Sequence, residues 1–185
     1  MALVTNDPTF SLAKGLERLW TDHVVWTRLY IIAAVDGRPE AAQAAARLLR
    51  NQEDIGNAIA PLYGSDAGEA LTGLLKEHIM IAVDLIEAAK SGDEIKFAEL
   101  DASWTQNAGE IATFLSGANP NWPRDDVADL LDLHLSLTKG EVVARLEKDF
   151  DGDVKAFDEI LTEILTLSDA LADGIIKQFP ERFAA

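Results

Sequence analysis

Hydrophobic residues recur at helical spacing along most of the chain. The segment 10–35 shows the pattern well, with this series of residues at helical spacing: Leu12, Leu16, Leu19, Trp20, Val24, Trp26 or Thr27, Tyr30 and Ile31. This spacing places them on one face of a helix. No stretch alternates between apolar and polar residues for long enough to indicate a strand. The pattern therefore predicts an all-α protein.

Turn-forming residues divide this pattern into six main helices. The breaks fall at positions 36–39, 63–65, 91–93, 117–123 and 151–153, where Gly, Pro, Asn, Asp and Ser gather. The predicted helices are about 10–35, 40–62, 66–90, 94–116, 124–150 and 154–177, and Gly140 either kinks or ends the fifth. Short connectors between long helices favour antiparallel neighbours. We therefore expect a single domain, a bundle built from helical hairpins.

A nine-residue pattern recurs at 19–27, 74–82 and 130–138. Each copy has two apolar residues, two mostly polar ones, a histidine, three mostly apolar residues and a small residue. The only three histidines of the chain, His23, His78 and His134, occupy the same place in each copy. The pattern predicts three pseudo-repeated hairpins, about 10–64, 65–120 and 121–180. Such hairpins could form an open array, but the matching histidines favour closure around a common axis.

The returning helices of the first two hairpins carry matching polar pairs. Asn51 precedes Asp54 by three residues, and Asn107 precedes Glu110 by three residues. Residues three apart share a helix face, and both pairs should stand level with the histidine of their hairpin because all α-helices rise equally per residue. We expect these pairs to face inward, where polar groups must form hydrogen bonds or bind a ligand.

The third hairpin matches the other two less closely. A strict offset places Glu163 at the asparagine position and Thr166 at the carboxylate position. Three extra residues in the preceding turn would instead bring Asp169 to the carboxylate position. Asp169 is favoured because it lies between Leu167 and Leu171, and Glu163 is the alternative.

Three histidines with carboxylates make a sufficient ligand set for a divalent metal, and helical bundles often hold metals between facing helices. Zn, Fe or Mn suits this mixture of imidazole and carboxylate. Asn51 and Asn107 would hold an imidazole or a bound water from behind. Hydrolytic or oxidative chemistry would suit such a centre, although the sequence does not decide whether the protein is an enzyme. The predicted ligands are His23, His78, His134, Asp54, Glu110 and Asp169.

A different interpretation is a metal-free small-molecule-binding or protein-interaction module in which the histidines are structural. Four tryptophans are present. Trp20 shares a helix face with His23 and Thr27, and apolar walls with a few polar groups are typical of ligand pockets. Arg28 and Arg47 could meet an anionic group there.

Familiar catalytic and metal motifs are absent from the sequence. It contains no Glu-x-x-His, His-x-x-x-His or His-Glu-x-x-His spacing, no Gly-rich phosphate loop and no Gly-flanked nucleophile. The acidic stretch 149–153 resembles the start of a calcium loop, but the twelfth position is Ile160, where such a loop has Glu. The expected centre therefore rests on the three histidines.

Charge and composition limit the classes of partner that this protein could bind. The net charge of −16 argues against nucleic acid and anionic membranes, and it suits a metal cation. The chain has no cysteine, which excludes thiolate ligands and disulfides. No apolar run reaches the length of a membrane span, and the first ten residues lack a secretory signal pattern. We expect a cytoplasmic protein, with a homo-oligomer left open, and solvated acidic faces near 125–126 and 147–153.

Three short segments resemble those of small all-helical bacterial proteins of uncharacterised function. They are Arg47-Leu48-Leu49-Arg50-Asn51, the segment 107–115 and Gln178-Phe179-Pro180. The resemblance would span most of the chain. It implies an intracellular bacterial origin and carries no activity with it.

Overall fold

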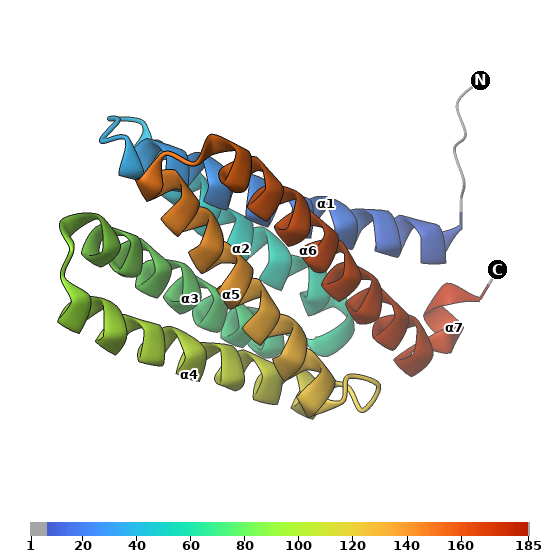
Figure 1. The fold of residues 1–185 in the computed structure, drawn as a ribbon. Coiled ribbons are helices and arrows are strands. Elements are labelled where there is room, and N and C mark those ends of the chain that lie inside the picture. Colours follow the sequence, from blue (N-terminus) through green and yellow to red (C-terminus); the bar gives the residue numbers. More distant parts are fainter. Residues whose placement is uncertain (1–6, 185) are drawn as a thin grey trace, which may run out of the picture.

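The computed structural model describes residues 7–184, and they form an all-α bundle, as predicted (Figure 1). The helices are α1 (Pro8–Val35), α2 (Ala41–Tyr63), α3 (Ser65–Ser91), α4 (Glu94–Ala118), α5 (Arg124–Glu147), α6 (Phe150–Gln178) and the short α7 (Pro180–Phe183). None of the helices within 7–184 combines the length and apolar character needed to cross a membrane.

The helix ends follow from local capping. The Asp7 side chain accepts hydrogen bonds from the amides of Thr9 and Phe10 at the start of α1. Gly92 adopts the left-handed conformation that ends α3. The predicted boundary between the last two long helices was wrong, because Lys148 ends α5 in the left-handed conformation and Asp149 caps α6 through the amide of Gly152. Gly140 lies inside α5.

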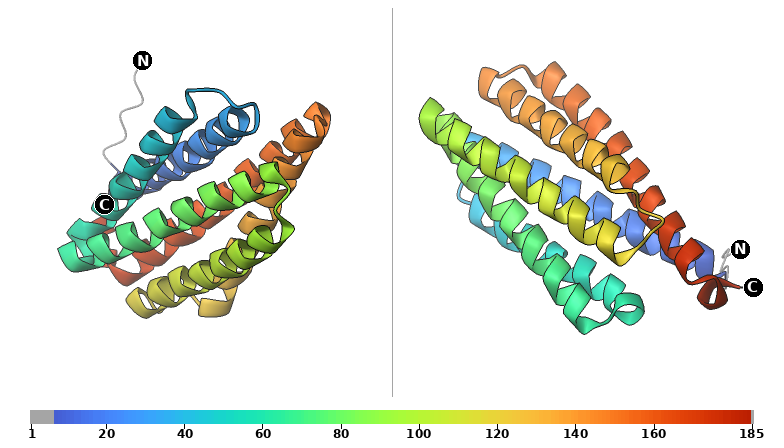
Figure 2. Two further views of the ribbon diagram at one scale, coloured as in Figure 1. Left: turned by 90° about the vertical axis from the view of Figure 1, so that its left-hand side faces the viewer. Right: turned by 90° about the horizontal axis from the view of Figure 1, so that it is seen from below.

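The six long helices close into a ring. Each helix packs against the next one in the chain, and α6 returns to pack against α1. Helix α1 also contacts α3 and α5. Figure 2 shows the bundle from two further sides, with α1 and α6 lying along each other. This arrangement agrees with the expected closure, while the origin of the three hairpins by repetition stays a prediction.

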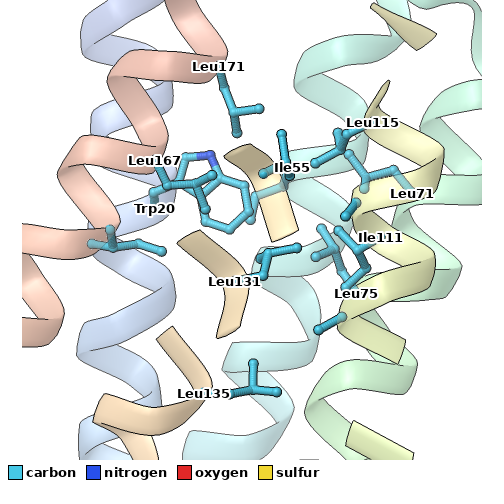
Figure 3. Packing of buried hydrophobic residues seen from close by; sticks show 14 of the residues in the cluster. Trp20, Ile55, Leu71, Leu75, Ile111, Leu115, Leu131, Leu135, Leu167 and Leu171 are labelled. Atoms are coloured by element: carbon cyan, nitrogen blue, oxygen red, sulfur yellow. The ribbon is translucent and has the colours of Figure 1, made fainter. Parts of the chain in front are cut away.

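Two hydrophobic clusters fill the bundle. The larger one receives side chains from all six long helices, and Figure 3 shows part of it, including Trp20, Ile55, Leu75, Ile111, Leu131 and Leu167. The smaller one gathers Tyr30, Ile31, Ala34, Ala44, Ile86 and Val142 near the other end of α1. The three histidines lie where these clusters meet.

Helices α2 and α3 approach each other closely at two glycines. A Cβ atom on Gly68 would lie 2.7 Å from the carbonyl oxygen of Gly56, and one on Gly56 would lie 2.0 Å from Oγ1 of Thr72. No side chain fits at either position without a shift of the helices. The two glycines therefore set the distance between α2 and α3.

Candidate functional site

The three histidines converge inside the bundle. His23 on α1, His78 on α3 and His134 on α5 are 3%, 4% and 4% exposed. The ring centroids of His23 and His134 are 5.7 Å apart, and those of His78 and His134 are 6.5 Å apart. His134 is therefore the ring in contact with both others.

Each imidazole meets a polar side chain 29 residues further along the chain, on the returning helix of its hairpin. In the second hairpin, Nδ1 of His78 lies 2.9 Å from Oδ1 of Asn107. The amide nitrogen of Asn107 donates to the carbonyl of Leu74, so its oxygen must face the ring. Nδ1 of His78 is therefore the donor, and the lone pair of the neutral ring lies on Nε2.

In the third hairpin the partner is a carboxylate. Nδ1 of His134 lies 2.9 Å from Oε2 of Glu163, and Oε1 of Glu163 is buried with no hydrogen-bond partner within the described part of the chain. The strict offset between the hairpins, which put Glu163 at the position of the asparagines, was therefore right for this hairpin. The preference for Asp169 as its carboxylate was wrong. Asp169 is exposed, because Leu167 and Leu171 occupy the inner face of α6.

In the first hairpin two neighbouring side chains, Asn51 and Gln52, form the polar group beside His23. The amide of Asn51 donates to the carbonyl of Leu19. Gln52 donates to Oδ1 of Asn51 and to the carbonyl of Leu48, and its Nε2 lies 3.3 Å from Nδ1 of His23. Gln52 was not predicted, because Asn51 and not Gln52 matches Asn107 in residue type. The constant separation of 29 residues from the histidine is the signal that identifies Gln52.

The backbone carbonyls of the histidines are also occupied. The hydroxyls of Thr27 and Thr138 donate to the carbonyls of His23 and His134, each at 2.8 Å. The indole of Trp104 donates to the carbonyl of His78 at 3.1 Å. Thr27 thus supports the histidine of its own helix, and Thr138 repeats this role.

Two tryptophans pack beside the imidazoles. The ring of Trp20 lies edge-on to His23 at 5.7 Å, and that of Trp104 lies 5.0 Å from His78. Trp20, Trp104 and Trp122 are buried in the larger hydrophobic cluster. His23 and His78 thus each pack against an indole ring.

The histidines line a small cavity with a free volume of about 20 Å³. That volume is enough for one water molecule or one ion. Most of the other lining side chains are apolar, and they come from α1, α2, α3, α4 and α5: Tyr30, Leu48, Ile79, Ala82, Val83, Leu85, Ile86, Trp104 and Val142. Among the described residues, hydrogen bonds to the three rings are made at Nδ1.

Burial disfavours protonation of two of these rings. It lowers the pKa of His23 well below its ordinary value and lowers the pKa of His78 to about 3. The neighbouring His134 lowers both pKa values further. His23 and His78 are therefore neutral at physiological pH, which is the form that binds metals.

The predicted carboxylate ligands do not reach the histidines. The side chain of Asp54 is 46% exposed and lies 3.6 Å from Arg47, and the exposed Glu110 accepts a hydrogen bond from Gln106. One turn beyond each asparagine the helix has rotated these residues outward. Within residues 7–184, no three His, Asp or Glu side chains are positioned to share a metal ion.

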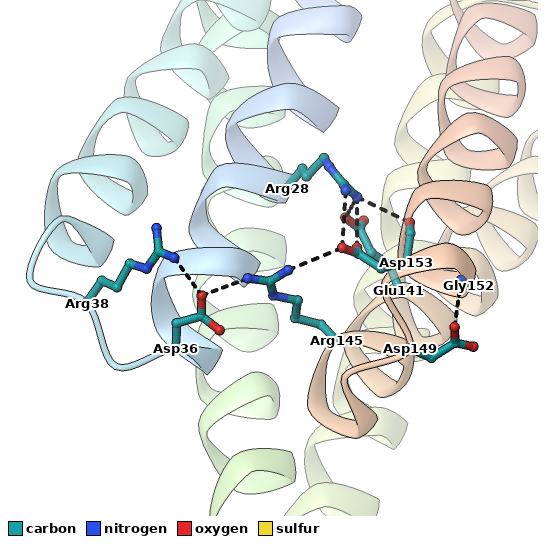
Figure 4. Close-up of polar contacts among 8 residues, drawn as sticks. All are labelled: Arg28, Asp36, Arg38, Glu141, Arg145, Asp149, Gly152 and Asp153. Carbon is teal, nitrogen blue, oxygen red and sulfur yellow. Dashed lines mark hydrogen bonds and ion pairs between the residues drawn. The ribbon is translucent and has the colours of Figure 1, made fainter.

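Arg28 does not face the cavity as a ligand-binding group. Its guanidinium contacts Glu141 at 2.5 Å and Asp153 at 2.9 Å, and Arg145 joins Asp153 to Asp36 (Figure 4). Asp153 is 2% exposed, so the prediction of a solvated acidic face was wrong at this residue. Burial raises the pKa of Glu141 to about 7, although the Arg28 guanidinium opposes the shift. This cluster joins α1, α5 and α6.

Comparisons with protein-family models, with characterised proteins and with solved structures found no match to this chain. The resemblance to small bacterial helical proteins therefore stays a prediction.

Proposed function

We propose that this protein binds one divalent transition-metal ion through His23, His78 and His134. The observation that carries the proposal is the convergence of three buried imidazoles, from three helices, on a cavity of about 20 Å³. Metal-binding histidines usually donate their other ring N–H to an oxygen acceptor. Asn107 and Glu163 provide such acceptors for two of the three rings.

The ligand atoms would be the three Nε2 atoms. Nδ1 of His78 and of His134 faces an oxygen acceptor, which leaves Nε2 as the free nitrogen of these two rings. Nδ1 of His23 faces the amide nitrogen of Gln52, a donor, so His23 would have to change tautomer before its Nε2 could bind a metal. Imidazole nitrogens bind zinc at about 2.0–2.1 Å. The rings would have to move closer together than the centroid distances of 5.7 and 6.5 Å in this structure. Metal binding would therefore draw His23 and His78 toward His134.

The ligand set favours zinc or iron over manganese. The exposure of Asp54, Glu110 and Asp169 removes the carboxylates that would suit manganese. Three imidazoles leave a fourth position, but an ion would already take up the cavity of about 20 Å³, so a bound water would need the lining side chains to move apart. A zinc ion lowers the pKa of bound water to about 7. Hydrolysis would also require room for a substrate, so the enclosed cavity favours metal binding over hydrolytic chemistry.

Elemental analysis and chelator competition test the proposal. The protein is prepared metal-free, reloaded with Zn²⁺ or Fe²⁺, and compared with the double variant His23→Ala/His78→Ala. We expect one metal ion per wild-type chain and none on the double variant. Asp169→Asn is the matched control, because this predicted ligand is an exposed side chain of α6. Equal affinities of the wild type and the double variant would refute metal binding.

A metal-free module is the second candidate. It is favoured by the absence, within residues 7–184, of three His, Asp or Glu side chains positioned to share a metal ion. The histidines would then be structural groups whose hydrogen bonds join the two helices of each hairpin. A wild-type protein that binds no metal in the same experiment would support this candidate.

A further inference from the structure

Helices α5 and α6 pack against each other (Figure 1), and a groove runs along the surface between them. The groove consists of two hollows with free volumes of about 570 and 230 Å³. Leu130 lines both hollows, so they adjoin. Along α5 the lining residues extend from Asp126 to Leu137, which is about 16 Å at 1.5 Å per residue. The groove is therefore as long as about three turns of a helix.

The α5 wall of the groove carries a row of leucines. Leu130, Leu133 and Leu137 line the larger hollow, and their spacing of three and four residues places them on one helix face. Leu133 is 48% exposed, and the other two side chains are half-buried. An apolar row at this spacing is how one amphipathic helix packs against another.

The rim of the groove is acidic. Its exposed carboxylates are Asp158 and Glu159 at the larger hollow and Asp126 and Asp173 at the smaller one, whereas the lysines that line it are Lys155 and Lys177. The four carboxylates outnumber the two lysines in a chain whose net charge is −16. This rim attracts a cationic partner, and it repels a second copy of the same acidic chain.

Two buried polar atoms of groove-lining residues have no hydrogen-bond partner within residues 7–184. They are Oε1 of Glu163 at the larger hollow and the indole nitrogen of Trp122 at the smaller one. The side chain of Glu163 is 2% exposed, and Trp122 is 4% exposed. Buried polar atoms are normally paired. An occupant of the groove that carries N–H and C=O groups would offer partners to both.

We propose that the groove between α5 and α6 binds an amphipathic helix of a partner protein, with apolar residues on one face and lysine or arginine residues beside them. The apolar residues cover the leucine row, and the basic residues lie against the rim carboxylates. This interaction does not depend on metal binding, because the partner contacts the outer surface of the bundle.

A labelled synthetic peptide of leucine and lysine tests this surface. A length of about 18 residues covers the groove and exceeds the length at which isolated helices are marginal. In one peptide the leucines recur at helical spacing, and in the other the same residues are scrambled so that no apolar face forms. We expect fluorescence anisotropy to show about tenfold tighter binding of the patterned peptide, because only this peptide can cover the leucine row.

Variants of the protein locate the binding site. Leu133→Ser should weaken binding of the patterned peptide about tenfold, the usual loss for a central interface residue. Met80→Ser is its control, because Met80 lies on α3 and is 61% exposed. Both side chains are exposed, so both variants should fold, and circular dichroism checks this.

A second pair of variants tests the charge of the rim. Asp158→Asn/Glu159→Gln should weaken binding about 2- to 10-fold, because exposed ion pairs contribute little individually. The matched control is Glu77→Gln/Asp84→Asn, which removes the same charge from two exposed residues of α3. We expect this control to bind the peptide nearly as tightly as the wild type.

Equal binding of the patterned and scrambled peptides would show general attraction to an acidic protein and would overturn the proposal. Losses in the α3 variants as large as in the groove variants would place the peptide elsewhere, with the same consequence. Analytical ultracentrifugation tests the other occupant. A wild-type dimer that dissociates in Leu133→Ser would show that a second copy of this chain covers the groove, and would overturn the basic partner.

Discussion

Hydrogen bonds hold each histidine at two points, the ring and the backbone carbonyl. His78 shows both, with Nδ1 bound to Asn107 and its carbonyl bound to the indole of Trp104. The first bond sets the tautomer of the ring. The second fixes the helix turn from which the ring projects.

Stability should depend on pH through His78. In the unfolded chain its pKa is near 6.5, whereas burial lowers the folded pKa to about 3. The unfolded state therefore takes up a proton first, and the stabilisation present above pH 6.5 is lost as the pH falls toward 3. The loss should approach about 1.4 kcal/mol per pH unit for this one group. Urea titrations of the metal-free protein between pH 7.5 and 5 measure it.

His78→Gln isolates this contribution, because glutamine does not titrate. We expect the free energy of unfolding of the variant to fall less steeply below pH 6.5 than that of the wild type. Parallel curves would mean that His78 is protonated as readily in the folded state as in the unfolded state.

The sequence predicted the convergence of the histidines better than it predicted their partners. The matching positions of His23, His78 and His134 in the three similar segments were enough to place them at a common centre. The carboxylates of Asp54 and Glu110 were wrongly predicted to face inward. A residue three positions after a buried one lies at the edge of the buried helix face, and the packing of the neighbouring helices decides whether it is covered. Asp54 shows this, since it is exposed one turn beyond the buried Asn51.

At the scale of helices, Gly56 and Gly68 allow α2 and α3 to lie close together. A larger side chain at either position would push the two helices apart. Gly68→Ala would bring Cβ within 2.7 Å of the Gly56 carbonyl oxygen. We expect it to destabilise the protein by about 1–3 kcal/mol, the usual cost of overpacking. Chemical denaturation measures the change.

Gly73 on the same helix provides the control. No atom lies within 4 Å of a Cβ placed there. Gly73→Ala should stabilise the protein by roughly 0.5–1 kcal/mol, because alanine favours the helix more than glycine does. If both substitutions changed stability equally, the close approach at Gly68 would have no energetic role.

The helices themselves were predictable because each carries a continuous apolar face and ends at residues that break helices. The boundary between α5 and α6 was not, because it depends on which aspartate caps the second helix. The sequence offers three equivalent candidates for the capping residue, Asp149, Asp151 and Asp153. In the structure Asp149 caps α6, and Asp153 is buried against Arg28.

At the scale of the whole molecule, the buried ion cluster connects the first helix of the bundle with the last two, where the ring of helices closes. Arg28 on α1 contacts Glu141 on α5 and Asp153 on α6. Removing one partner of a buried ion pair costs about 3–5 kcal/mol, because it leaves an uncompensated charge. We expect Arg28→Met to destabilise the protein by that amount in urea denaturation.

Lys155→Ala is the comparison for a surface ion pair. Lys155 lies 3.8 Å from Glu159, and its side chain is 78% exposed. Such pairs contribute about 0–1 kcal/mol. A loss in Arg28→Met no larger than in Lys155→Ala would mean that the cluster does not stabilise the closed ring.

The closure of the ring between α1 and α6 has a consequence for synthesis of the protein on the ribosome. His23 is made early, but the last imidazole and its carboxylate partner lie on α5 and α6. The ring of helices cannot close until α6 has left the exit tunnel. At a synthesis rate of about 5–20 residues per second, the first helices remain without their contacts to α6 for many seconds. A nascent chain that carries one or two of the three histidines lacks the complete cavity, so a metal bound as proposed would enter only after all three histidines have emerged.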